Sequence, residues 1–134
     1  MIASPHVLVV DDEPHIGRII KMKLEQGPFR VTVAADGGAA LDALAQHPDI
    51  AAVVLDVMMP VRSGFEVLAE MRASAQWRET PCLILTAAGQ AVYQERALAL
   101  GATDFMTKPF SPKKLMQRTA ELVGVPPAAP DALA

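Results

Sequence analysis

Cysteine and aromatic residues are scarce in this sequence of 134 residues, which has one Cys, one Trp and one Tyr. A single thiol excludes internal disulfide bonds, and Cys82 lies in the apolar run CLILT, where a buried, unreactive thiol is expected. No Lys or Arg run occurs and the formal net charge is −3, so the electrostatic footprint of a nucleic-acid-binding protein is missing. No apolar run could cross a bilayer, and the amino terminus lacks a signal-peptide pattern. These absences predict a cytoplasmic protein that binds neither nucleic acid directly nor a membrane.

Hydrophobic residues, in contrast, make up 51% of the chain. They can form the core of one compact domain, and the length leaves no room for a second. We expect this domain to cover residues 1–124. The segment 125–134, VPPAAPDALA, is rich in Pro and Ala and predicts a tail or the beginning of a linker.

Short apolar, β-branched segments alternate along the chain with segments of helical periodicity. The predicted strands are 7–10, 31–34, 52–56, 82–86 and 103–107, and the predicted helices are about 14–26, 38–46, 64–75, 90–100 and 111–123. Five βα units in succession predict an α/β fold, in which helices cover both faces of a parallel sheet. The last strand is the most polar, so we expect it at an edge of the sheet.

Polar residues stand at the ends of four of these strands. Asp11 and Asp12 follow the first strand and Asp56 ends the third, whereas Thr86 ends the fourth and Lys108 follows the fifth. Sites in open α/β sheets form at the carboxyl ends of the strands. We therefore expect these side chains to lie together at one edge of the sheet.

Three clustered carboxylates require an explanation. Two unit charges about 4 Å apart repel by about 4 kcal/mol at an effective dielectric constant of about 20. Asp12 is explained in part as the N-cap of the helix that begins near Pro14. A hard cation would relieve the remaining repulsion, and oxygen ligands without Cys or His favour Mg²⁺. With that charge neutralised, the Asp56 carboxylate could attack phosphorus, while Lys108 and Thr86 bind the phosphoryl oxygens.

Several ordered motifs resemble those of the receiver domains of two-component response regulators. They are VLVVDDEP, VVLDVMMPVRSGFEVL, LILTA and GATDFMTKPFSPKKL, and the resemblance covers residues 6–123. It implies a flavodoxin-like, doubly wound α/β fold with a five-stranded parallel sheet in the order 2-1-3-4-5 and five helices. It also implies that Asp56 accepts phosphate from a phosphohistidine and becomes a 4-aspartylphosphate. Mg²⁺ would be held by Asp11, Asp12, Asp56 and the Met58 backbone carbonyl.

The resemblance further implies how a phosphorylation signal is transmitted. Lys108 matches the phosphate-binding lysine of the family, with a cis bond to Pro109, and Thr86 and Phe105 match its switch pair. The output surface would comprise the fourth helix, fifth strand and fifth helix, with Tyr93, Ala97, Phe105 and Lys113 as candidates. Implied partners are a sensor histidine kinase or a histidine phosphotransfer protein, and a downstream effector or an output domain of the same protein. A phosphorylation-dependent dimer is a further expectation.

Other functions fit the residues less well. An aspartyl phosphatase normally needs a second acid two positions after its nucleophile, where this chain has Met58. An FMN carrier needs a phosphate-binding loop after the first strand, where this chain has Asp11, Asp12 and Glu13. We therefore expect no enzyme beyond Mg²⁺-dependent self-phosphorylation and slow self-dephosphorylation. The alternative is a receiver-like interaction module that acts without phosphorylation.

The three histidines show no pattern of a site. His6, His15 and His47 lack the spacing of metal ligands, so we expect them at the surface.

Overall fold

The computed structural model describes residues 4–57, 63–87 and 91–125, and its helices and strands lie within these ranges. The strands are β1 (His6–Val10), β2 (Arg30–Ala34), β3 (Ile50–Asp56), β4 (Cys82–Ala87) and β5 (Asp104–Lys108). The helices are α1 (Pro14–Glu25), α2 (Gly37–Gln46), α3 (Gly64–Ala73), α4 (Ala91–Ala99) and α5 (Pro112–Val123). All neighbouring strands pair in parallel, in the order β2-β1-β3-β4-β5. The predicted α/β class, strand order and edge position of the last strand are confirmed.

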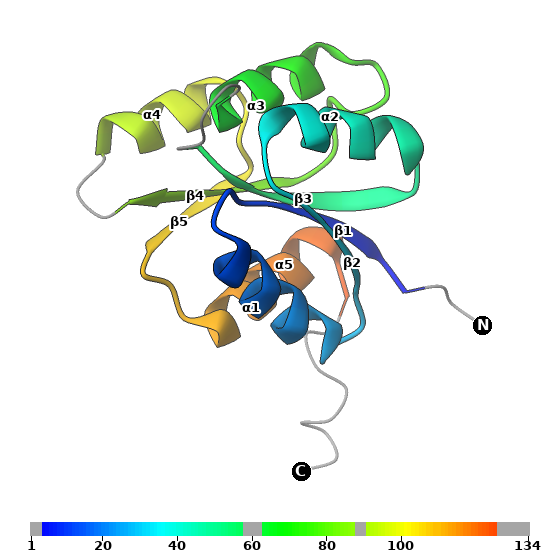
Figure 1. Cartoon of the computed structure of the whole chain (residues 1–134). Helices are drawn as coiled ribbons and strands as arrows, with labels where there is room; N and C mark the ends of the chain where they lie inside the picture. The colour runs from blue at the N-terminus through cyan, green and yellow to red at the C-terminus, as the bar shows by residue number, and fades with distance from the viewer. Residues whose placement is uncertain (1–3, 58–62, 88–90, 126–134) are drawn as a thin grey trace.

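The sheet is covered on both faces, with α2, α3 and α4 on one side and α1 and α5 on the other (Figure 1). The continuous apolar run of β1 follows from this arrangement. Leu8 and Val10 belong to the apolar cluster beneath α2 and α3, while Val7 and Val9 belong to the cluster beneath α1 and α5. Full burial of such a side chain stabilises the fold by about 1.5–3 kcal/mol. Each layer therefore supplies half of the burial that holds this central strand.

Helices α2, α3 and α5 each begin with a side-chain cap, from Asp36, Ser63 and Ser111 respectively. The Ser63 hydroxyl accepts a hydrogen bond from the Glu66 backbone N–H, and the Glu66 carboxylate accepts one from the Ser63 N–H at 3.1 Å. The prediction that Asp12 caps the first helix is wrong. Helix α1 begins at Pro14, so Glu13 takes the N-cap position, without a side-chain cap hydrogen bond. Asp12 is thereby left at the edge of the sheet.

The histidine prediction is only partly correct. His15 is exposed on α1, as expected, but His6 is 4% exposed. The prediction for His6 is wrong because this residue begins β1, which lies between β2 and β3 in the sheet. His47, at the end of α2, is half-buried.

Cys82 is fully buried at the start of β4, as predicted. Burial raises the pKa of its thiol to about 12. None of the described helices is both long and apolar enough to span a membrane.

Candidate functional site

The carboxyl edge of the sheet brings together residues that are far apart in the sequence. Asp11 follows β1, Asp56 is the last residue of β3, and Lys108 is the last residue of β5. Neighbouring strands end at nearly the same level, with Val10 paired to Leu55 in the sheet register. The strand topology therefore positions the polar side chains at this edge.

Lys108 lies among three carboxylates. Its Nζ donates to Oδ2 of Asp11 at 3.0 Å, to Oδ2 of Asp56 at 3.1 Å and to Oε1 of Glu13 at 3.3 Å. Asp11 and Asp56 are only 1% and 4% exposed, so these two charges are largely removed from water. The lysine thus balances part of the negative charge that the sequence concentrates here.

The ionisation of Lys108 reflects two opposing influences. Burial alone would lower its pKa, because it disfavours the charged amine. Hydrogen bonds to Asp11 and Asp56, together with the charges of these carboxylates, outweigh that influence and raise the pKa above its ordinary value. The amine is therefore a permanent cation at neutral pH.

A hard divalent cation fits the carboxylates at this edge. Asp11, Asp12 and Asp56 each offer an oxygen within 4.8 Å of the others. Asp11 is held in place because its Oδ1 accepts the Glu13 backbone N–H at 2.9 Å. The set contains only oxygen donors, which suits Mg²⁺. An open pocket of about 240 Å³, lined by Asp12, Glu13, Asp56, Ala87 and Lys108, gives access from solvent.

Thr86 contributes a hydroxyl group with no partner. Its side chain is fully buried, and its Oγ1 has no hydrogen bond in the described part of the chain. Burying a hydroxyl without a partner costs about 1–3 kcal/mol. Such a group is poised to bind an added ligand atom.

Phe105 lies on β5, next to the strand that carries Thr86. The sheet register pairs Phe105 with Ile84 and Thr86 with Thr107. Since side chains alternate along a strand, Thr86 and Phe105 face the same side of the sheet. Phe105 is half-buried and packs against the apolar cluster beneath α2, α3 and α4.

Most residues of this site were predicted from the ends of the strands, but Glu13 was not expected to contact Lys108. The sequence contained an indication of this contact, because Glu13 directly follows the two aspartates at the end of the same strand. The expected cis bond between Lys108 and Pro109 is present. Met58, whose carbonyl was expected to bind Mg²⁺, and Ala88, two positions after Thr86, lie outside the described residues.

Comparison with known proteins identifies the family. Residues 7–120 match the family model described as the response regulator receiver domain. The chain belongs to this family. As a receiver domain of two-component systems, it is a member of a signalling family and not of a catalytic enzyme family.

Solved receiver structures are closely similar in fold. Chemotaxis protein CheY4 of Vibrio cholerae is 32% identical, with a TM-score of 0.83 over 90% of this chain and 99% of that one. The receiver domain of the Francisella response regulator 1452 is 37% identical, with a TM-score of 0.80 over 90% and 97% of the two chains.

Curated relatives of the receiver domain are longer proteins. The probable transcriptional regulator ycf27 of Cyanophora paradoxa is 42% identical over 118 residues, which are 87% of this chain and 47% of the relative. SrrA, a transcriptional regulatory protein of Staphylococcus aureus, is 35% identical over 120 residues, or 90% and 48% of the two chains. This chain spans about half the length of the curated relatives it matches.

Proposed function

We propose that Asp56 is the phosphoacceptor of this receiver domain. One observation carries the proposal: a nearly buried carboxylate ends a central strand, 3.1 Å from the amine of Lys108 and beside two further aspartates that could share a cation. A carboxylate that served only the fold would gain little from so much negative charge around it.

The transfer is a displacement at phosphorus. An Asp56 carboxylate oxygen forms a bond to phosphorus while the bond from phosphorus to an imidazole nitrogen of a phosphohistidine breaks, and the freed imidazole takes up a proton. Lys108 would balance the charge of the phosphoryl oxygens, and the buried Thr86 hydroxyl would donate a hydrogen bond to one of them. These residues position and neutralise the group, and no external substrate is turned over.

Magnesium would be held by Asp11, Asp12, Asp56 and the backbone carbonyl of Met58. When bound, it supplies positive charge beside the transferring oxygens. The contribution of the chain is to hold the carboxylates at one edge, with Asp11 fixed by the Glu13 N–H.

Thr86 and Phe105 would form the switch. Movement of the Thr86 hydroxyl toward a phosphoryl oxygen would open space on the face of the sheet that Phe105 shares. The altered surface would comprise α4, β5 and α5, with Tyr93 and Lys113 on it. The prediction that Ala97 contributes to this surface is wrong, because its side chain is fully buried in the apolar cluster beneath α4. A downstream effector, an output domain of the same protein or a second phosphorylated copy would bind there.

Phosphorylation can be tested directly on the purified chain. Incubation with a small phosphodonor and Mg²⁺ should add one base-labile phosphoryl group by intact-mass measurement, and Asp56→Asn should abolish this gain. Asp42→Asn, an exposed aspartate on α2, is the matched control and should react as the wild type does. Equal incorporation by Asp56→Asn would show that another residue is the acceptor.

The second candidate function is a receiver-like module that binds its partner without phosphorylation. It predicts equal partner affinity with and without the phosphodonor, and no effect of Asp56→Asn.

The domain boundary stays a prediction: we assign residues 1–124 to the receiver domain and 125–134 to a tail or linker.

A further inference from the structure

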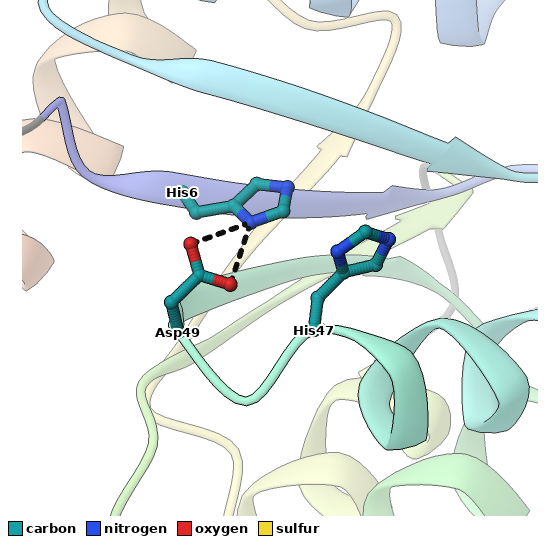
Figure 2. A group of neighbouring side chains, drawn as sticks. All are labelled: His6, His47 and Asp49. Carbon is teal, nitrogen blue, oxygen red and sulfur yellow. Dashed lines mark hydrogen bonds and ion pairs between the residues drawn. The ribbon is translucent and has the colours of Figure 1, made fainter.

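A second group of polar side chains lies at the opposite edge of the sheet from Asp56. It consists of His6, His47 and Asp49, which we call the His6 cluster (Figure 2). His6 begins β1, whereas His47 and Asp49 belong to the turn between α2 and β3. Asp11 follows His6 by five residues along β1, so the two edges are about 16 Å apart. The His6 cluster is therefore separate from the site of the proposed phosphorylation.

The turn that carries His47 and Asp49 is well defined. The Ile50 N–H donates to the His47 carbonyl at 3.2 Å and closes the turn. Pro48 within it has a fixed φ angle, which reduces the conformational freedom of the segment. The two side chains are thus presented to His6 by a constrained backbone.

The three side chains converge on a common point. His6 Nδ1 lies 3.2 Å from both carboxylate oxygens of Asp49. The rings of His6 and His47 are 5.1 Å apart between centroids and nearly perpendicular, with an interplanar angle of 76°. Figure 2 shows a ring nitrogen of His47 directed toward the His6–Asp49 pair. One nitrogen or oxygen from each residue lies within 4.8 Å of the other two.

Thr32 fixes the His6 ring from its other side. Its Oγ1 lies 2.7 Å from His6 Nε2, and a hydroxyl group can accept the Nε2 proton. In that tautomer the lone pair of His6 Nδ1 is available to bind a metal ion beside the Asp49 carboxylate. A hydrogen bond on the second ring nitrogen is the usual support of a metal-binding histidine.

Arg30 leaves room for a ligand on Asp49. Its Nη2 donates to Oδ2 of Asp49 at 2.7 Å, and Oδ1 remains directed toward His6.

We propose that His6, His47 and Asp49 form a second metal site, which binds a divalent transition-metal ion such as Zn²⁺. Two imidazole nitrogens and one carboxylate are typical Zn²⁺ ligands, with water in the fourth position. Tetrahedral ligands stand about 3.3–3.5 Å apart, so modest rotation of the half-exposed Asp49 and of His47 would close the site. The nitrogen donors distinguish it from the all-oxygen edge near Asp56, which favours Mg²⁺. A bound ion would tie the turn between α2 and β3 to β1.

Zinc binding can be measured by calorimetric titration of the untagged chain, with saturating Mg²⁺ present to occupy the oxygen site. One Zn²⁺ per chain is expected, and substitution with Co²⁺ should give the strong visible absorption of a tetrahedral site. His47→Gln and Asp49→Asn should each weaken binding at least about tenfold, and Thr32→Val by about tenfold. These variants are used in place of a His6 variant because His6 is buried and its replacement could prevent folding.

The chain has three histidines, so His15 supplies a matched control. His15→Gln should bind Zn²⁺ as the wild type does, and so should Asp56→Asn, which separates this proposal from the proposed phosphorylation. Absence of Zn²⁺ binding would overturn the proposal. Unchanged affinity in His47→Gln and Asp49→Asn, or an equal loss in His15→Gln, would also overturn it, because the ion would then be bound elsewhere.

Discussion

Gly64 lies so close to the backbone of Asp56 that a Cβ atom on Gly64 would be 2.3 Å from the Asp56 carbonyl oxygen. The Gly64 N–H also donates to the neighbouring Val57 carbonyl at 3.2 Å. The first residue of α3 is therefore docked directly on the end of β3. Only a residue without a side chain allows this approach, so Gly64 contributes to the position of Asp56.

Gly64→Ala should destabilise the domain because the new methyl group must displace backbone and not a flexible side chain. We expect a loss of about 2–3 kcal/mol in the free energy of unfolding, measured with urea. Gly38→Ala is the control, since its nearest neighbour is a side-chain oxygen of Asp36 at 3.3 Å. Alanine is favoured over glycine in helices, so that change should stay within about 1 kcal/mol. Equal effects of the two substitutions would contradict the argument.

Lys108→Met should destabilise the protein by leaving Asp11 and Asp56 buried without their cation. Removing one partner of a buried ion pair costs about 3–5 kcal/mol. Because Lys108 is partly exposed, we expect its replacement to lower the free energy of unfolding by about 3 kcal/mol. Arg118→Met, which removes the exposed pair with Asp104, should cost at most about 1 kcal/mol. Chemical denaturation of both variants tests this, and comparable losses would show that Lys108 behaves as a surface lysine.

Magnesium should raise the thermal stability of the wild type, because it binds the folded carboxylate edge and not the unfolded chain. The gain is about 2.7 kcal/mol when the ion is at 100 times its dissociation constant. Asp11→Asn should remove much of this gain, whereas Asp42→Asn should retain it. The melting temperature can be measured by far-ultraviolet circular dichroism. If millimolar Mg²⁺ leaves it unchanged, the metal site is excluded.

Cys82 should resist alkylation in the folded protein at pH 8 to 9 and react rapidly in denaturant. Its folded pKa of about 12 lies above that of an unfolded thiol, about 8.5. Between these values the unfolded state binds fewer protons, so the stabilising contribution is full below about pH 8.5 and is lost as the pH rises toward 12. Thiol labelling with and without denaturant measures the difference. Rapid labelling of the native chain would contradict the burial of Cys82.

Self-dephosphorylation should be slow, because Met58 and Ala88 occupy positions where polar side chains would orient the attacking water. Placing Asn at Met58 together with Glu at Ala88 should speed hydrolysis about tenfold, equivalent to about 1.4 kcal/mol of barrier. A phosphate-release time course under saturating Mg²⁺ compares the two proteins. If the double variant decays no faster, water positioning does not limit the rate.

The fold and the carboxylate edge were predictable from the sequence because both follow from short-range patterns. Apolar runs of four to six residues specify buried strands, and the polar residues after them must meet where parallel strands end. Lys108 could be placed near Asp11 by this reasoning, although they are 97 positions apart.

What the sequence did not reveal depends on neighbours that are distant along the chain. The burial of His6 is set by its pairing with both β2 and β3, and its contact with Asp49 spans 43 positions. The missing partner of Thr86 is likewise a property of the folded surroundings and not of any local pattern. The predicted N-cap, Asp12, precedes the observed one, Glu13, by a single residue, and helix periodicity does not resolve so small a shift.

The two layers that enclose the sheet differ in their chromophores. Trp77 and Tyr93, the sole tryptophan and tyrosine of the chain, both contact the layer beneath α2, α3 and α4. Tryptophan fluorescence therefore reports on that layer alone, while far-ultraviolet circular dichroism reports on the helices of both layers. Coincident unfolding curves from the two signals would show that the layers melt as one cooperative unit. An earlier loss of ellipticity would show that α1 and α5 separate first.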